Sequence, residues 1–413
     1  MRQNSRPVLD LCRLAAALLV ITIHTAPLSD VSAGADFFLT RILARVAVPY
    51  FFMLTGYFLE KGQWHGMGHT LGKTALIYAF SVLLYLPLNL YAGAFAPFSP
   101  GQFLKELLVD GTFYHLWYLP AVLLGVPVAW ALRRLGWKGG LAAAGALYLL
   151  GLLGDSYYGF AARVPLLKAM YEGLFTVSSY TRNGLFFAPL FLLLGALCTR
   201  VRLKWAWPLA AGSFAAMCAE AFLLKAAGAP RHDSMYVMLP LCMMALFSGL
   251  VQNNAGRCRA AAGTALWVYL LHPWCIVLVR GAAKVLGLQK LFVESGPGHF
   301  IAVALASFAL AFCAQWAAAR LAPARVPATA RAWREVDLAA LRHNAQVLME
   351  ALGGCSLMAV LKADAYGHGA GKVAKALRRC GVRAFAVATV AEGVALRRAF
   401  VRGEILVLGY SPP

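Results

Sequence analysis

The sequence predicts a polytopic α-helical membrane domain of about ten spans, followed by an incomplete α/β barrel segment. Of its 413 residues, 61% are hydrophobic and only 13% are charged, whereas about one half of an average soluble protein is apolar. Apolar windows of roughly 20 residues recur as far as Leu321, and each is long enough to cross a hydrocarbon core of ~30 Å. Beyond residue 326, short alternating helix and strand patterns replace these windows.

The ten predicted spans follow one another from the N-terminus to residue 320. Their ranges are 8–28, 42–59, 74–91, 116–132, 140–153, 184–199, 206–225, 235–251, 262–280 and 299–320. The N-terminus is basic and then apolar but lacks a small-residue cleavage site, so we expect the first segment to remain as an uncleaved span.

The formal charge of +21 is explained better by membrane topology than by nucleic-acid binding, because many of the cationic residues lie in short connections between spans. The basic residues expected on the cytoplasmic side are Arg2, Arg6, Arg13, Lys61, Lys73, Arg133 to Lys138, Arg200 to Lys204, Arg257 and Arg259. An even number of spans then places both termini in the cytoplasm, with a multi-pass domain in the plasma membrane. Arg280, Lys284 and Lys290 oppose this orientation.

Nine cysteines are scattered along the chain, an odd number without paired metal-ligand spacing. We therefore expect neither a disulfide framework nor a metal site.

A segment with two prolines, residues 322–330, ends the apolar part of the chain. We place the boundary there, between a membrane domain over 1–325 and a second domain over 326–413. The elements expected beyond it are strand Trp333–Val336, helix Leu338–Leu352 capped by Asp337, strand Leu357–Leu361, helix Gly371–Arg379, strand Ala384–Thr389, helix Ala391–Phe400 and strand Glu404–Leu408. This order is the start of a parallel, TIM-type βα barrel.

Lys362 lies where the strand 357–361 ends, ahead of a turn punctuated by Gly367 and Gly369. Catalytic groups of βα barrels lie at the carboxyl ends of strands. Apolar neighbours can lower the pKa of such a lysine and let it form a Schiff base with an aldehyde, for which pyridoxal phosphate is the obvious candidate. The alternative is a lysine that only extends from a strand end into solvent.

The run Val360-Leu-Lys-Ala-Asp-Ala-Tyr-Gly-His-Gly369 resembles the cofactor-lysine motif of alanine racemases, and the resemblance extends from Trp333 to the end. It implies that Lys362 holds pyridoxal 5'-phosphate covalently and moves a proton at the substrate Cα. It also places Tyr366 and Leu408 at cofactor-contacting positions. For both residues, packing is the alternative role.

The chain ends after about three strands of a barrel that typically needs about 250 residues. In this family a tyrosine from a C-terminal β domain serves as the second base, and the full racemase is a homodimer. We therefore expect this chain to be a fragment of a longer bifunctional protein or the product of a truncated reading frame, unable to racemise alone.

In the first span, Arg13 and His24 are eleven residues apart, so both lie on one helical face with Asp10, separated by a rise of roughly 16 Å. Ionisable groups inside a span usually face a protein interior or a pathway. The alternative is that Arg13 extends to the cytoplasmic surface while His24 lies at the outer interface.

This Arg13/His24 spacing resembles the signature of acyltransferase-3 membrane enzymes, as do Val48–Tyr57, Arg182–Pro189 and Tyr269–Trp274, over residues 6–320. The resemblance implies His24 as general base or acyl carrier and Arg13 as a group that binds an anionic acyl donor or orients the helix. Together, the two resemblances indicate the membrane-bound serine/alanine racemases of vancomycin-resistance type.

Three further residues are candidates for the same membrane site. His115 and Arg182 are expected at the outer ends of their spans, where they could share a cavity with His24. Anchoring of this region at the interface by Trp117 and Tyr118 is the alternative. His272, in the middle of its span, is either buried and hydrogen-bonded or lines a pathway.

Three functions follow from these patterns. The first is a membrane-bound racemase that supplies D-serine or D-alanine for peptidoglycan precursors, with the membrane domain importing or delivering the L-amino acid. The second is a membrane O-acyltransferase with a vestigial racemase segment. The third is a transporter or binding protein without catalysis. Loss of acyl transfer on substitution of His24 would separate the second from the third.

Overall fold

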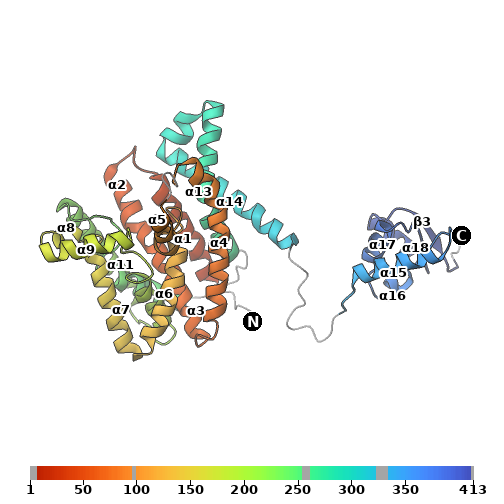
Figure 1. Cartoon of the computed structure of the whole chain (residues 1–413), viewed down its shortest axis with the longest axis horizontal. Coiled ribbons are helices and arrows are strands. Elements are labelled where there is room, and N and C mark those ends of the chain that lie inside the picture. The colour runs from red at the N-terminus through yellow and green to blue at the C-terminus, as the bar shows by residue number, and fades with distance from the viewer. Residues whose placement is uncertain (1–6, 95–98, 254–260, 322–333, 411–413) are drawn as a thin grey trace. The chain divides into compact units, whose positions relative to one another are not determined.

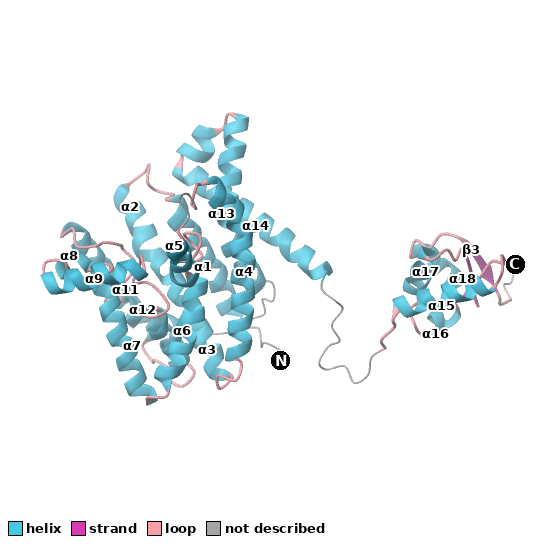
Figure 2. Cartoon of the chain, viewed as in Figure 1, coloured by secondary structure: helices cyan, strands magenta, loops and turns pink. Residues whose placement is uncertain are grey.

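A computed structural model describes residues 7–94, 99–253, 261–321 and 334–410. The chain forms two compact units, divided between Ala322 and Pro323. The first unit is built from helices packed side by side, and the second contains the three strands of the described chain (Figures 1 and 2). Each unit is considered by itself below.

The helices of the first unit follow the apolar pattern of the sequence. Their bounds are α1 Pro7–Thr25, α2 Ala33–Phe37, η1 Phe38–Ile42, η2 Leu43–Val46, α3 Ala47–Lys61, α4 Met67–Tyr91, α5 Pro100–Lys105, η3 Glu106–Asp110, α6 Tyr118–Arg133, α7 Gly136–Leu153, α8 Tyr158–Ala161, α9 Pro165–Val177, α10 Ala188–Leu197, α11 Ala206–Ala226, α12 Leu239–Gln252, α13 Ala261–Leu286, η4 Lys290–Glu294 and α14 Gly296–Leu321.

Seven helical segments of the described chain are long and apolar enough to cross a membrane. They are Val8–Thr25, Ala33–Lys61, Met67–Tyr91, Gly136–Leu153, Ala206–Ala226, Gly263–Leu286 and Gly296–Ala318. Each coincides with a predicted span. The other three predicted spans overlap the shorter apolar helices α6, α10 and α12. Each of these helices is shorter than the roughly 17 residues that a crossing needs. Ten crossings therefore remain a prediction.

Helices α3 and α10 form the closest helix pair of the first unit. At Gly56 an added Cβ would overlap the carbonyl of Leu192, and at Gly195 it would overlap the carbonyl of Met53. The two backbones can approach this closely only because glycine stands at both contact positions, as is common in helix pairs within membranes. Phe52, Met53 and Leu192 are buried in the core around this contact.

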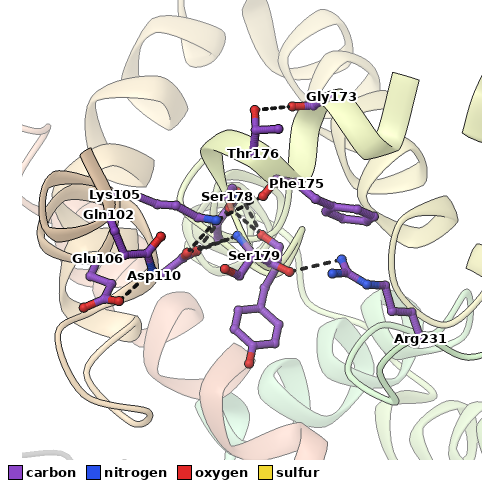
Figure 3. Close-up of polar contacts among 12 residues, drawn as sticks. Gln102, Lys105, Glu106, Asp110, Gly173, Phe175, Thr176, Ser178, Ser179 and Arg231 are labelled. Atoms are coloured by element: carbon purple, nitrogen blue, oxygen red, sulfur yellow. Dashed lines mark hydrogen bonds and ion pairs between the residues drawn. The ribbon is translucent and has the colours of Figure 1, made fainter. Parts of the chain in front are cut away.

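A carboxylate ties the connection after α9 to the segment α5–η3 (Figure 3). Asp110 accepts hydrogen bonds from the backbone N–H of Ser179, at 3.0 Å, and from the hydroxyl of Ser178. Lys105 donates to the carbonyl of Phe175 at 3.0 Å, and Arg231 donates to the carbonyl of Ser179 at 3.2 Å. This network fixes the chain that leads into α10.

The second unit is a three-stranded parallel sheet with the order β1-β2-β3. Its elements are α15 Leu338–Ala351, β1 Met358–Val360, α16 Lys362–Tyr366, α17 Ala370–Arg379, β2 Ala384–Val387, α18 Val390–Arg398 and β3 Glu404–Val407. The side chain of Asp337 caps α15 by accepting from two backbone N–H groups, as the sequence predicts. Phe385 and Val387 of the central strand are buried among the helices.

One predicted strand is absent from the described part of this unit. Trp333 lies outside the described residues, and 334–336 form no strand. A strand needs a ladder partner for its N–H and C=O groups, and the sheet ends at β1 on the one side and at β3 on the other. The other three predicted strands and three predicted helices are confirmed to within two residues at each end, whereas the sheet shows an open edge rather than a barrel.

Candidate functional site

Lys362 directly follows the buried Leu361, which extends β1 by donating to the carbonyl of Ala386 at 2.7 Å. The side chain of Lys362 is exposed, and its Nζ lies 5.9 Å from the ring centre of Tyr366. Among the described residues, this amine forms no hydrogen bond or ion pair. The expected apolar surroundings are therefore not formed by the second unit, and the amine is accessible.

A left-handed turn follows the lysine. Ala363, Asp364, Ala365 and Tyr366 all have φ between 51° and 54°, a conformation that costs roughly 1–2 kcal/mol for each L-residue. Local hydrogen bonds hold the turn, since Asp364 accepts from the N–H of Ala370 at 2.7 Å.

Glu392 of α18 fastens the start of the same turn. Its carboxylate accepts from the backbone N–H groups of Ala363 and Ala388, each at 2.8 Å, and these bonds lower the pKa of Glu392. The segment after Lys362 is thereby joined to the end of β2.

Leu408 lies at the same edge of the sheet as Lys362. The register pairs Val360 with Ala386 and Ala386 with Leu406. Lys362 and Leu408 therefore follow the carboxyl ends of β1 and β3, which lie two strands apart, about 10 Å. Leu408 is 53% exposed and Tyr366 is 63% exposed. The three predicted cofactor residues are therefore accessible at one edge, and none of the three is buried in the core.

The two predicted catalytic residues of the first span lie apart. Arg13 forms an ion pair with Asp10 at 2.8 Å, one turn earlier on α1. His24 lies at the other end of the helix, roughly 16 Å further along the axis. The structure thus places Arg13 in a local pair with Asp10 and His24 in a different group.

His24 belongs to a cluster of three histidines from separate elements, which we call the histidine cluster: His24, His115 and His272. The ring centres of His24 and His272 are 5.3 Å apart, and those of His115 and His272 are 5.2 Å apart. Tyr114 covers His24 at 4.6 Å. The predicted grouping of His115 with His24 is what the structure shows, with His272 between them.

The hydrogen bonds of His272 define its tautomer. Its Nδ1 lies 2.9 Å from the carbonyl of Tyr269 and 3.2 Å from that of Val268. Both partners are acceptors, so Nδ1 carries the proton and Nε2 of the neutral ring is left as an acceptor. His272 is fully buried and this Nε2 has no partner in the described chain, which makes it a candidate general base.

The charges of Arg182 and Arg45 act on His24, and Asp155 is joined to Arg182 through Ser234. Arg45 and Asp155 were not among the residues selected from the sequence. Arg45 of η2 is 9% exposed, and Asp155, which follows α7, is fully buried. Burial lowers the pKa of Arg182, and the carboxylate of Asp155 opposes this shift. An arginine inside a predicted span is a functional candidate by default, so the same rule that selected Arg13 could have found Arg45.

Comparison with known proteins divides the chain in the same two parts. Residues 6–316 match the family described as an acyltransferase domain, and residues 336–413 match the N-terminal domain of alanine racemase. No solved structure matches the chain.

Relatives that match along the whole chain carry both parts. An amino-acid racemase of Enterococcus faecalis is 39% identical over 100% of the chain, and a serine/alanine racemase of Enterococcus gallinarum is 33% identical over 98% of it. The chain spans only 60% of the length of each of these relatives. An alanine racemase of Citrifermentans bemidjiense is 53% identical over 18% of the chain, and the match spans 20% of that protein.

Proposed function

We propose that this chain is part of a membrane-bound, pyridoxal-phosphate-dependent serine/alanine racemase. The premise is that the chain belongs to the acyltransferase-domain family and carries the N-terminal domain of an alanine racemase. The family and the seven apolar helices make it a membrane protein. The observation that carries the proposal is the accessible amine of Lys362, which follows the carboxyl end of β1 in the parallel sheet.

The residues of this edge fit pyridoxal phosphate. Lys362 offers an unpaired amine to its aldehyde carbon, and the ring of Tyr366 lies beside that amine. When bound, the cofactor draws electrons away from the substrate Cα and makes its proton acidic. Lys362 Nζ would then remove or return that proton on one face, while Glu392 and Asp364 hold the turn that positions it.

The test is absorbance of the purified chain titrated with pyridoxal phosphate. We expect a visible band that Lys362→Ala abolishes and that Lys372→Ala, at an exposed lysine of α17, retains. A band of equal strength in Lys362→Ala would reject the assignment.

Racemisation is tested in a chimera, because this chain covers 60% of its relatives. The chain is joined to the segment of the Enterococcus gallinarum relative that lies beyond the match. Conversion of L-serine or L-alanine that depends on Lys362 supports the racemase, whereas a folded chimera that binds the cofactor through Lys362 but converts neither amino acid contradicts it. We propose that such a complete racemase domain forms a homodimer and supplies D-amino acids for peptidoglycan precursors.

For the membrane unit, we propose a multi-pass fold in the plasma membrane of a bacterium with both termini in the cytoplasm. Basic connections at one end of the spans support this orientation. The unit would deliver the L-amino acid to the cytoplasmic racemase domain.

Acyl transfer is a second candidate function of this unit, and the histidine cluster favours it. His272 keeps an acceptor nitrogen buried and free of partners in the described chain, next to His24. A general base of this kind could take a hydroxyl proton during transfer from an acyl donor. If the unit transfers acyl groups, His24→Ala and His272→Ala should each abolish transfer to membrane acceptors, while the exposed His65→Ala retains it.

A further inference from the structure

We propose that Arg45, Arg182 and Asp155 bind the zwitterion of a free α-amino acid. We call this group of three residues the arginine site. The inference rests on the proposed delivery of an L-amino acid by the membrane unit, and it is independent of cofactor binding at Lys362.

The first observation is a set of unsatisfied charged atoms. Arg45 Nε and Nη2, Arg182 Nε and Asp155 Oδ2 are all buried without a hydrogen-bond partner in the described part of the chain. Arg45 is 9% exposed and Asp155 is fully buried. Buried charged groups are nearly always hydrogen-bonded, and a buried charge without a partner is strongly destabilising. These atoms are therefore available to bind a ligand.

The second observation is that opposite charges here do not pair directly. Across the described residues, no ion pair of 4.0 Å or shorter joins Asp155 to Arg45 or Arg182. Asp155 nevertheless interacts electrostatically with both arginines. The charges therefore lie near one another with their free atoms unpaired. A ligand with both a negative and a positive group can bridge such an arrangement, whereas a simple anion would leave Asp155 Oδ2 unsatisfied.

The third observation is the surplus of positive charge. The charges of Arg41, Arg45 and Arg182 act on one another and on His232, whereas Asp155 and Asp110 are the two carboxylates that act on Arg182. Two guanidinium groups suit a carboxylate, because each presents a fork of donors to its two oxygens. The single free oxygen of Asp155 suits an ammonium group.

The scaffold holds two of the three side chains, Arg182 and Asp155, in place before a ligand arrives. Ser234 connects these two, because its hydroxyl accepts from Arg182 Nη1 at 3.0 Å and its N–H donates to Asp155 Oδ1 at 2.8 Å. The N–H of Met235 donates to the same oxygen at 3.0 Å. These bonds occupy Oδ1 and leave Oδ2 free.

The network around Asp110 holds Ser178 and Ser179, which precede Arg182 in the chain (Figure 3). Asp110 accepts from the N–H of Ser179. Asn183 donates to the hydroxyl of Ser178 and accepts from the N–H groups of Leu185 and Phe186, ahead of α10. Arg182 therefore lies in a connection that hydrogen bonds hold before and after it, so binding of a ligand needs little reordering of this loop.

The experiment measures binding of radiolabelled L-serine to the full chain carrying Lys362→Ala, in lipid nanodiscs without pyridoxal phosphate. We expect saturable binding that unlabelled L-serine and L-alanine displace. Acetate, which lacks the ammonium, and ethanolamine, which lacks the carboxylate, should each compete at least about tenfold more weakly, a loss of the order expected for one charged contact. Arg45→Gln and Asp155→Asn should each weaken binding by at least about tenfold, and Arg163→Gln, at an exposed arginine, should not.

Absence of saturable binding would overturn the inference, and so would acetate competing as well as L-serine, since that result describes a simple anion site. Unchanged binding in a folded Asp155→Asn protein would also overturn it. If the substituted chains do not fold, the competition pattern of the parent chain decides by itself. Because binding is measured in the Lys362→Ala chain, its result does not depend on the racemase proposal. That proposal is tested separately by the cofactor titration.

Discussion

Ionisable side chains buried at one end of the membrane unit determine what that unit can do. An arginine or histidine inside an apolar bundle costs several kcal/mol relative to a hydrated one unless the protein or a ligand compensates it. Here Arg45, His115 and His272 are buried to 9% exposure or less and retain unpartnered nitrogens within the described chain. Such groups persist when function requires them, which is why the proposals rest on them rather than on the paired Arg13.

The pKa of His232 responds to the positive charges around the arginine site, so the pH dependence of stability can report on them. Burial, followed by the charges of Arg182, Arg231, Arg45 and Arg41, lowers its pKa to about 4 from an ordinary 6.5. Between these values the unfolded chain binds a proton that the folded chain excludes. Stability should therefore fall as the pH drops from about 6.5 towards 4.

The measurement is thermal unfolding of the protein in detergent, followed by tryptophan fluorescence between pH 4.5 and pH 7.5 at roughly half-unit steps. His232→Gln should remove part of the loss of stability at low pH, whereas His343→Gln, at an exposed histidine of the other unit, should not. An identical pH profile for His232→Gln and the parent protein would contradict the prediction.

At the scale of elements, the contact between α3 and α10 depends on two glycines. Gly195→Ala would place a methyl group against the backbone carbonyl of Met53, which cannot move as a side chain can. Overpacking of this kind costs about 1–3 kcal/mol, so we expect a lower unfolding temperature in detergent. Gly212→Ala in α11 is the matched control, because its Cβ meets no atom within 4 Å. Equal unfolding temperatures for the two variants would show that the helices are less tightly packed than described.

The long elements could be predicted from the sequence because their signals are local. An apolar run of 20 residues identifies α4 or α14 without knowledge of its neighbours, and Asp337 followed by an amphipathic pattern identifies α15. Helix α9, Pro165–Val177, was missed because it is shorter and amphipathic. The strand predicted at 333–336 was wrong over its described part, since strand formation depends on a partner that lies elsewhere in the chain.

For the whole molecule, a site could be predicted from the sequence only where its residues lie close together in the chain. Lys362 could be found from its motif and strand position, and its neighbour Tyr366 lies only four residues away. By contrast, the histidine cluster joins positions 24, 115 and 272, and only tertiary packing brings the rings of His24 and His115 to 5.3 Å and 5.2 Å from that of His272. Asp155 carried no signal beyond its place after an apolar run, and its meaning comes from Ser234 and Arg182, which are distant in sequence.

The orientation of the membrane unit decides from which side the arginine site is reached. Helix α11 provides a test, because its 21 residues span about 30 Å and its two ends can be compared within one element. Ala227 is exposed just beyond the end of α11, on the connection that continues to Ser234, and Val201 is exposed ahead of its start.

In a chain whose nine native cysteines are replaced by serine, Ala227→Cys and Val201→Cys are introduced one at a time. With both termini in the cytoplasm and ten crossings, a membrane-impermeant maleimide applied to intact cells should label Ala227→Cys but label Val201→Cys only after the cells are permeabilised. The basic connection from Arg200 to Lys204 would then lie inside, and the connections that carry Asp155, Arg182 and Ser234 would lie on the side of the medium. The opposite labelling pattern would contradict the orientation and place these connections on the cytoplasmic side, next to the pool that a cytoplasmic racemase would use.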